Sequence, residues 1–285
     1  MNCLNNKYSG KWKKAVKIQP RSITGRMRLL ARWFKYVLIS LKAWYFDFAW
    51  NAFRAQIRLI WLSVRDIISK SKKVECNICG WKGFDFYPNV GWGYNEKSML
   101  CPACDCLDRY RSLAAILWTY TSCFSPNSYV IEVGPSASFQ QYCLAQKKNK
   151  NYVSFDIKRH AMEKGDITQM RYHDNTADYF LCFHVLEHIE NDFQALSEIR
   201  RVLKPGGLAI LQVPIDWCVE QTCEYSASNP RDVGHFRRYG RDFAQRVSSC
   251  GLKVSEVSVV DFVAEDEIEQ FGFSKEPVFF AQKVT

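Results

Sequence analysis

The sequence predicts an α/β fold with a doubly wound, mostly parallel sheet over about its last 155 residues. Two observations carry this prediction. Buried-type apolar runs alternate with helical segments, which is the pattern of strands joined by crossover helices. The apolar runs also end in corners that carry acids, histidines or glycines, and sheets of this kind bind ligands at the carboxyl ends of their strands.

The predicted elements follow one another in a regular order. The apolar run "YVIEVG" predicts a strand that ends in a glycine turn, and "SASFQQYCLAQKK" predicts the helix after it. Next come a strand at "YVSFDI", a corner at "GDIT", a strand at "ADYFLCFH", a helix at "NDFQALSEIRRVL", a turn at "KPGG" and a strand at "LAILQVP". The segment "RDFAQRVSSCGLKVSEVSVV" predicts a further helix and strand, and "PVFFAQKV" a last strand.

Positive charge is concentrated at the N-terminus. Residues 1–75 hold 17 Lys and Arg against 3 Asp and Glu, a balance of +14, whereas the rest of the chain holds 22 basic and 26 acidic residues, a balance of −4. This asymmetry indicates an anionic partner for the first segment, either a membrane or a nucleic acid.

Residues 1–73 are predicted to be a basic, aromatic-rich helical segment. No Pro or Gly occurs from Arg26 to Ile68, which favours long helix, and ten aromatic residues lie between Trp33 and Trp61. Uncharged stretches of about six residues are far too short for a membrane span. A basic face beside an aromatic face is typical of a helix lying at a bilayer surface. Packing of the aromatics on the catalytic domain or on a second subunit explains them equally well, and nucleic-acid binding is a third reading.

The N-terminal sequence "MNCLNNKYSGKWKKAVKIQP" lacks the apolar region of a signal peptide, so we expect a cytoplasmic protein whose basic segment is a candidate for attachment to the inner face of the membrane. Cytoplasmic thiols are reduced, and paired cysteines there indicate a metal before a disulfide.

Residues 74–112 are predicted to be a zinc-ribbon-like region. Cys76 and Cys79 form one C-x-x-C pair, and Cys101 and Cys104 form a second pair after 21 intervening residues. Four thiolates in two such turns suit a tetrahedral zinc ion, and a site with four protein ligands is structural rather than catalytic. Ordinary buried cysteines are the alternative, and Cys106 is a spare candidate ligand.

From residue 113 to 285 the chain resembles the class I S-adenosylmethionine-dependent methyltransferases. The matching residues are "VIEVG", "FDI", "GDIT", "HVLEHIENDFQALSEIRRVLKPGGLAILQVP" and "GHFRRYGRDFAQRVSSCGLKV". The region before it is similar to a bacterial methyltransferase group that carries "CPxCGSxxRHR", written here "CPACDCLDRYR" with Asp105, Cys106 and Tyr110 in place of Gly, Ser and His. The resemblance implies a seven-stranded Rossmann-like methyltransferase sheet with S-adenosylmethionine as cofactor.

The resemblance also implies which residues contact the cofactor. Gly134 lets the backbone approach the methionine part, and Glu132 orders the loop or binds the amino group. Asp156, 22 residues beyond Gly134 and followed by Ile157, is placed to accept the ribose hydroxyls. Asp166 with Ile167 matches the pair beside the adenine. Where most of the family has G-x-G-x-G, this chain has glycine only at 134, with Ser136 as a candidate contact and Ser138 at the last position.

The resemblance places His184 at the mouth of its strand as a candidate cofactor contact. With His235 it is also a candidate general base, because methyl transfer to a hydroxyl needs one. Glu187 and His188 have a structural alternative as a helix cap or as partners of each other. Arg237 and Tyr239 are candidates for anchoring the next helix. Residues 215–234 form the longest insertion and are expected to build a substrate lid.

Two function classes remain open from the sequence. The first is a methyltransferase of a small-molecule, glycan or lipid-linked acceptor, held near an anionic membrane surface. The second is an RNA-binding protein or RNA methyltransferase that uses the zinc region and the basic segment, or a methyltransferase-like binding protein without catalysis. Base methylation is less expected, because the chain lacks an Asn/Asp-Pro-Pro-aromatic stretch after the fourth strand and a Pro-Cys pair in the domain. The oligomeric state is not predicted.

Overall fold

The computed structural model describes residues 10–20, 38, 46–68, 71–91, 94–148, 150–157, 161–229 and 232–284. They divide into two compact units. The N-terminal unit comprises the chain up to Ala115 together with Phe262–Lys275, and the sheet unit comprises Ile116–Asp261 and Glu276–Thr285. The predicted boundaries after residues 73 and 112 stay predictions. The return of residues 262–275 to the N-terminal unit is a feature that the sequence did not indicate.

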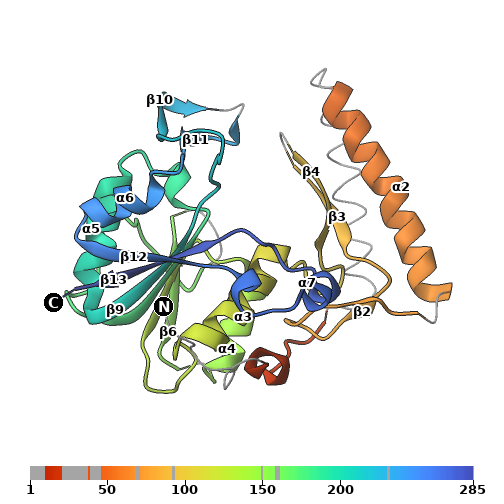
Figure 1. Ribbon diagram of the computed structural model, residues 1–285, viewed down its shortest axis with the longest axis horizontal. Helices are drawn as coiled ribbons and strands as arrows, with labels where there is room; N and C mark the ends of the chain where they lie inside the picture. The colour runs from red at the N-terminus through yellow and green to blue at the C-terminus, as the bar shows by residue number, and fades with distance from the viewer. Residues whose placement is uncertain are drawn as a thin grey trace. The chain divides into compact units, whose positions relative to one another are not determined.

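The sheet unit contains the predicted doubly wound sheet, with seven strands (Figure 1). The strand order is β12-β13-β9-β8-β5-β6-β7. The bounds are β5 Val130–Val133, β6 Tyr152–Asp156, β7 Glu163–Lys164, β8 Ala177–Phe183, β9 Leu203–Gln212, β12 Leu252–Val257 and β13 Val278–Lys283. Only β13 runs antiparallel to its neighbours in this sheet. The expected Rossmann-like, mostly parallel architecture is therefore confirmed.

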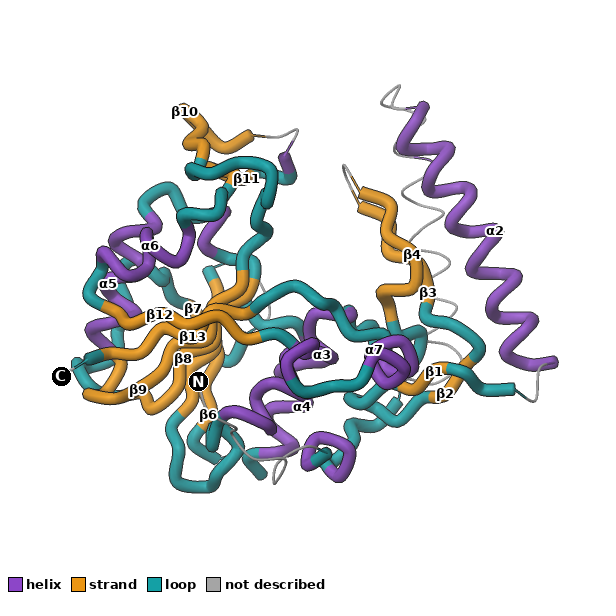
Figure 2. The backbone as a smooth tube through the Cα atoms, viewed as in Figure 1, coloured by secondary structure: helices purple, strands orange, loops and turns teal. Residues whose placement is uncertain are grey.

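The three predicted helices cover the sheet (Figure 2): they are α4 Ala137–Gln146, α5 Asp192–Val202 and α6 Phe243–Ser249. The sequence did not predict α3 Asp108–Tyr120, which begins in the N-terminal unit, or the short turns η2 Leu186–His188 and η4 Val259–Asp261. The core joins alternate strand residues, such as Ile131 and Val133, to the inner faces of α5 and α6. Ser136 caps α4 by accepting a hydrogen bond from the backbone N–H of Phe139, and Asn191 caps α5 in the same way through the N–H of Gln194.

The expected "KPGG" turn is built into β9 as a bulge instead of preceding the strand. Ala177 pairs with Leu203 and Tyr179 pairs with Leu208, so the glycines lie in the extra residues between these two pairs. A Cβ atom on Gly207 would lie 2.8 Å from the carbonyl oxygen of Lys204 and 3.0 Å from that of Ala177. The close approach of these backbones explains why glycine stands there.

The N-terminal unit combines one long helix, α2, with two small hairpins. Its elements are η1 Lys11–Lys14, α2 Phe46–Ile68, β1 Val74–Glu75, β2 Lys82–Gly83, β3 Tyr87–Gly91, β4 Tyr94–Leu100 and α7 Glu265–Phe271. One face of α2 packs on the hairpins: Arg58 binds Asp85 at 3.0 Å, and the Ser63 hydroxyl lies 2.8 Å from that of Tyr87. The indole of Trp12, 1% exposed, contacts Phe271 of α7 at a ring separation of 4.7 Å.

Within the segment expected to be helical, α2 spans Phe46–Ile68, and most of residues 26–45 lie outside the described residues. Along α2 lies an exposed apolar row, which consists of Phe46, Trp50, Phe53, Ile57, Ile60, Trp61, Val64 and Ile68. Within this row, Trp61 also contacts Phe84 at a ring separation of 6.2 Å. Among the described residues, none of the helices has the length and apolar character needed to cross a membrane.

Candidate functional site

The switch point of the sheet lies between β5 and β8, because the chain proceeds from β5 toward one edge and from β8 toward the other. Gly134 follows β5 and His184 follows β8. Both have left-handed backbones, with φ of +62° and +52°, which is unusual for a histidine. A Cβ atom on Gly134 would lie 2.7 Å from Cγ2 of Val185. The two strand ends therefore meet where doubly wound sheets bind ligands.

The next two strands of the sheet, β6 and β7, also end near acidic residues, Asp156 and Asp166. Asp156 ends β6, and its Oδ2 is 3.7 Å from the Cβ position of Gly134, so these two predicted contacts come together. Ile157 is 61% exposed beside it. Asp166 is exposed and accepts hydrogen bonds from the N–H and hydroxyl of Thr168 at 2.8 and 2.7 Å, while Ile167 is buried.

Glu132 and Ser136 have partners inside the protein. Glu132 is 1% exposed within β5 and accepts a hydrogen bond from the Tyr152 hydroxyl. Burial raises the pKa of Glu132 to about 8, although this hydrogen bond lowers it. The hydroxyl of Ser136 is occupied in capping α4. Of the two roles expected for Glu132, these contacts fit ordering of the strand and its loop better than a direct ligand contact.

Four predicted site residues gather beyond the end of β8. Nδ1 of His184 lies 3.3 Å from Oε1 of Glu187, and the rings of His188 and His235 are 4.7 Å apart, nearly perpendicular. Burial would raise the pKa of Glu187, but hydrogen bonding and charge from His184 outweigh it, so the pKa is lowered. Glu187 is therefore a buried carboxylate among three histidines.

Arg237 fixes this arrangement, a role different from the expected anchoring of the next helix. Its buried guanidinium donates to the carbonyls of Leu186, Ile189 and Glu190, and to the carboxylate of Glu224 at 2.9 Å. Strand β11, His235–Arg238, is thereby attached to η2.

Tyr239 anchors the following helix as expected. Its hydroxyl donates to Asp192 at 2.7 Å, and the same carboxylate accepts from Arg246 of α6. The expected lid segment contains β10, Cys223–Asn229, which pairs with β11 as a hairpin.

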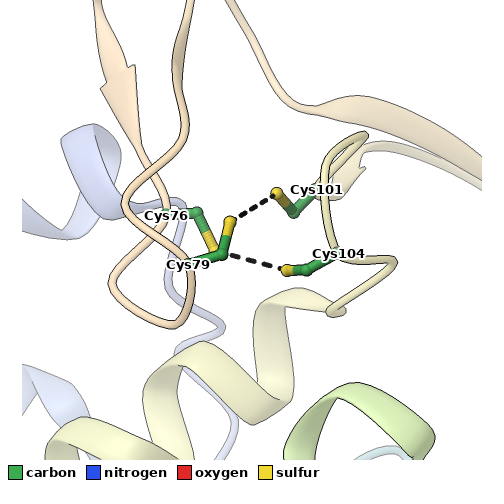
Figure 3. A group of neighbouring side chains, drawn as sticks. All are labelled: Cys76, Cys79, Cys101 and Cys104. Carbon is green, nitrogen blue, oxygen red and sulfur yellow. Dashed lines mark hydrogen bonds between the residues drawn. The ribbon is translucent and has the colours of Figure 1, made fainter. Parts of the chain in front are cut away.

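The four predicted cysteines form a second cluster, in the N-terminal unit (Figure 3). Their sulfurs lie within 4.8 Å of one another, with Sγ–Sγ distances of 3.9 Å for Cys76 and Cys104 and 3.7 Å for Cys79 and Cys101. Sulfurs placed tetrahedrally at about 2.3 Å from zinc are about 3.8 Å apart. The donor set and its dimensions fit zinc.

Both cysteine turns have the same backbone. The N–H of Gly80 donates to the carbonyl oxygen of Cys76, and the N–H of Asp105 donates to that of Cys101. Both donor residues, Gly80 and Asp105, have left-handed backbones. Asp105 thus takes the conformation for which glycine is usual. The sulfur of Cys106 donates to the carbonyl of Leu107 and lies outside the four-sulfur group.

Two cations border this cluster. Arg111, fully buried, donates to the carbonyl of Cys106 at 3.1 Å, and Lys17 donates to that of Asn77 at 2.7 Å. Burial raises the pKa of the Cys76 thiol, but hydrogen bonds from the other three cysteines outweigh it and hold the pKa well below its ordinary value. Positive charge beside the turns suits the net −2 charge of a zinc ion with four thiolates.

Comparison with known proteins adds the following findings. The sequence model of the family described as "Methyltransferase domain" matches residues 117–211. The chain is 32% identical over 101 residues to an uncharacterised 37.1 kDa protein in transposon TN4556 of Streptomyces fradiae, covering 35% of this chain and 27% of that one. It is 39% identical over 83 residues to the probable methyltransferase ltbC of Aspergillus luteorubrus, covering 27% of each. The chain thus spans roughly a quarter of the length of these relatives.

Among solved structures, the chain is similar to the 1,6-didemethyltoxoflavin-N1-methyltransferase of Burkholderia thailandensis, crystallised with 1,6-didemethyltoxoflavin and S-adenosylhomocysteine. The TM-score is 0.41 and the identity 14%, over 59% of this chain and 81% of that one. The family match lies wholly inside the sheet unit and includes Gly134, Asp156, His184 and Glu187. The similarity to known methyltransferases in sequence thus centres on residues 117–211.

Proposed function

We propose that the sheet unit is an S-adenosylmethionine-dependent methyltransferase acting on a small-molecule, glycan or lipid-linked acceptor. The observation that carries the proposal is the meeting of Gly134, Asp156 and His184 at the switch point of a sheet whose sequence matches a methyltransferase domain. Gly134 leaves room for the methionine part of the cofactor, and Asp156 accepts the ribose hydroxyls. Asp166 and Ile167 lie beside the adenine.

The reaction is a displacement at the methyl carbon. The acceptor atom forms a bond to that carbon while the carbon–sulfur bond breaks, and its electron pair leaves with sulfur as the neutral thioether of S-adenosylhomocysteine. The enzyme contributes mainly by aligning the two reactants and excluding water. A hydroxyl acceptor also loses a proton, and His184 or His235 is the proposed base.

Calorimetry of cofactor binding tests this proposal. Asp156→Ala removes two charge-assisted hydrogen bonds, each worth about 1.5–3 kcal/mol, so S-adenosylmethionine affinity should fall at least about tenfold. Glu256→Ala, which changes an exposed carboxylate of β12, is the control and should bind normally. An intact protein that binds neither S-adenosylmethionine nor S-adenosylhomocysteine would contradict the proposal.

We also propose one structural zinc ion on Cys76, Cys79, Cys101 and Cys104. Elemental analysis should find about one zinc per chain, lost in Cys79→Ser and in Cys104→Ser. The control Cys223→Ser changes an exposed cysteine and should keep the metal. Protein that stays folded without metal and has four ordinary thiols would contradict the zinc site. If Cys104→Ser kept its zinc and Cys106→Ser lost it, Cys106 would be the fourth ligand in place of Cys104.

For the N-terminal unit we propose attachment to the inner, anionic face of the cytoplasmic membrane. The exposed apolar row of α2 and the +14 balance of residues 1–75 support it. Each Lys or Arg near such a surface contributes about 1 kcal/mol, and buried apolar area adds to this. The acceptor would then be met at the membrane surface.

Co-sedimentation with liposomes tests this attachment. The triple change Ile57→Gln, Ile60→Gln and Val64→Gln should move the protein from the pellet of anionic vesicles to the supernatant. The control Val260→Gln with Val284→Gln removes comparably exposed apolar side chains elsewhere and should not. Wild-type protein that ignores anionic vesicles but binds RNA with strong salt dependence would instead favour the nucleic-acid function.

A further inference from the structure

We propose that Glu187, His188 and His235 bind a divalent first-row transition-metal cation beyond the end of β8, and that its open positions take an oxygen of the methyl acceptor. Metal binding itself stands on the geometry of these three side chains. Only the role of the acceptor oxygen rests on the proposed function.

The three side chains bring their ligand atoms close together. One atom from each lies within 4.8 Å of the others. Ligands about 2.1 Å from one cation are about 3.0–3.5 Å apart, so small side-chain rotations complete the site. Glu187 is 1% exposed, and its Oε2 is buried without a hydrogen-bond partner among the described residues. A buried carboxylate oxygen without a donor is costly, and a cation would satisfy it.

The neighbours of the three ligands are those that metal sites use to orient their ligands. Nδ1 of His235 lies 3.4 Å from Oδ1 of Asp232, which leaves Nε2 as the ligand atom. The second oxygen of Glu187 faces Nδ1 of His184 at 3.3 Å. Carboxylates that hold a ligating histidine in this way fix its ring and raise its basicity. Arg237 holds β11 against η2, so the ligands from the two segments keep their spacing.

The donor set selects the ion. Magnesium and calcium prefer oxygen ligands, and copper(I) prefers sulfur, whereas two imidazoles and a carboxylate suit manganese, iron, cobalt or zinc. Three protein ligands leave coordination positions open, as in catalytic rather than structural sites. A cation there would orient an acceptor hydroxyl and lower its pKa, so that the oxygen meets the methyl group ionised. Because His235 is then a ligand and is no longer free to act as the base, the proton of the hydroxyl passes to His184.

Mn²⁺ titration followed by electron paramagnetic resonance tests the site, using full-length, zinc-loaded protein without cofactor. Manganese prefers oxygen and nitrogen ligands to thiolates, so the cysteine cluster does not compete. We expect one bound Mn²⁺ per chain. Glu187→Gln, which keeps the size of the side chain, should weaken it at least about a hundredfold, because the loss of an outer-shell partner typically already costs a metal site about 10–100-fold. Asp232→Asn should fall within that lower range. His173→Ala, an exposed histidine of the sheet unit, is the matched control.

Two further readouts keep the outcomes distinct. Co²⁺ in the site should give weak visible bands that shift when acetohydroxamate, an oxygen chelator, is added. Circular dichroism and S-adenosylmethionine calorimetry on Glu187→Gln show whether the fold and the cofactor site survive. Wild-type protein that binds no Mn²⁺ or Co²⁺ outside the cysteine cluster, or a Glu187→Gln variant that binds them normally, would overturn the site even if cofactor binding is intact. Bound Co²⁺ that ignores acetohydroxamate would overturn the open positions.

Discussion

Gly134→Ala should destabilise the protein for two separate reasons. Its φ of +62° is a left-handed conformation, which costs an L-residue with a Cβ about 1–2 kcal/mol. The new Cβ would also lie 2.7 Å from Cγ2 of Val185, and overpacking of this kind costs about 1–3 kcal/mol. The expected loss in the free energy of unfolding is therefore about 2–5 kcal/mol.

A double-mutant cycle separates the two costs. Val185→Ala removes the atom that clashes but leaves the backbone strain, so Gly134→Ala should cost about 1–3 kcal/mol less in the Val185→Ala background. Urea unfolding of the four proteins, followed by circular dichroism, gives all the free energies needed. A loss below about 1 kcal/mol for Gly134→Ala alone, or a cycle without coupling, would refute the reasoning.

The same four proteins show what the glycine does for a ligand. If Gly134 stands there only because Val185 approaches it, the double variant should recover S-adenosylhomocysteine affinity together with stability. If the ligand itself occupies the space, the double variant should be folded but remain weak in calorimetry. The second result is the one we expect, because Asp156 lies beside the same Cβ position.

Three other expectations concern buried groups. Glu132 has a pKa of about 8 in the folded protein, above its unfolded value, so it ionises first in the unfolded chain and the free energy of unfolding should fall between about pH 4.5 and 8. Glu132→Gln should lack this part of the pH dependence, and a variant with an unchanged slope would contradict the prediction. Arg111→Met leaves the carbonyls of Met99, Phe271 and Gly272 without their donor. The free energy of unfolding measured in urea should therefore fall by at least about 3 kcal/mol, whereas no change would show that water replaces the guanidinium. Asp105→Gly relieves a left-handed residue and should raise the melting temperature with zinc content unchanged; a lower melting temperature would mean that the Asp105 side chain contributes more than its backbone costs.

The sheet and the ends of its strands were predictable because they depend on local patterns. Apolar runs separated by helical segments fix the order of elements, and parallel pairing then brings Gly134 and His184 to one edge. The two cysteine turns were equally local, since each is defined within four residues. These parts of the fold required no knowledge of which distant segments meet.

Features that depend on distant pairing were not visible in the sequence. The role of Arg237 depends on three carbonyl groups some 50 residues earlier, which carry no side-chain signal. The "KPGG" segment signals a turn by composition, but its pairing with Ala177 makes it a bulge within a strand. The pattern "HVLEH" with a later "HFRRY" contained the three proposed metal ligands, yet only the contact of β11 with η2 brings them together.

Because Phe262–Lys275 belongs to the N-terminal unit, the sheet unit cannot be obtained by simply truncating the protein at its N-terminus. Phe271 and Phe273 lie within 4.7 and 5.3 Å of the Trp12 ring, and Arg111 bonds to the carbonyls of Phe271 and Gly272. A fragment that begins at residue 116 would keep these phenylalanines and lose the groups that cover them. It should therefore expose apolar side chains in the segment between β12 and β13 and tend to aggregate. Shortened versions of the protein for crystallisation or for complementation should therefore retain residues 10–20, and the N-terminal unit cannot be exchanged between homologues as a simple prefix.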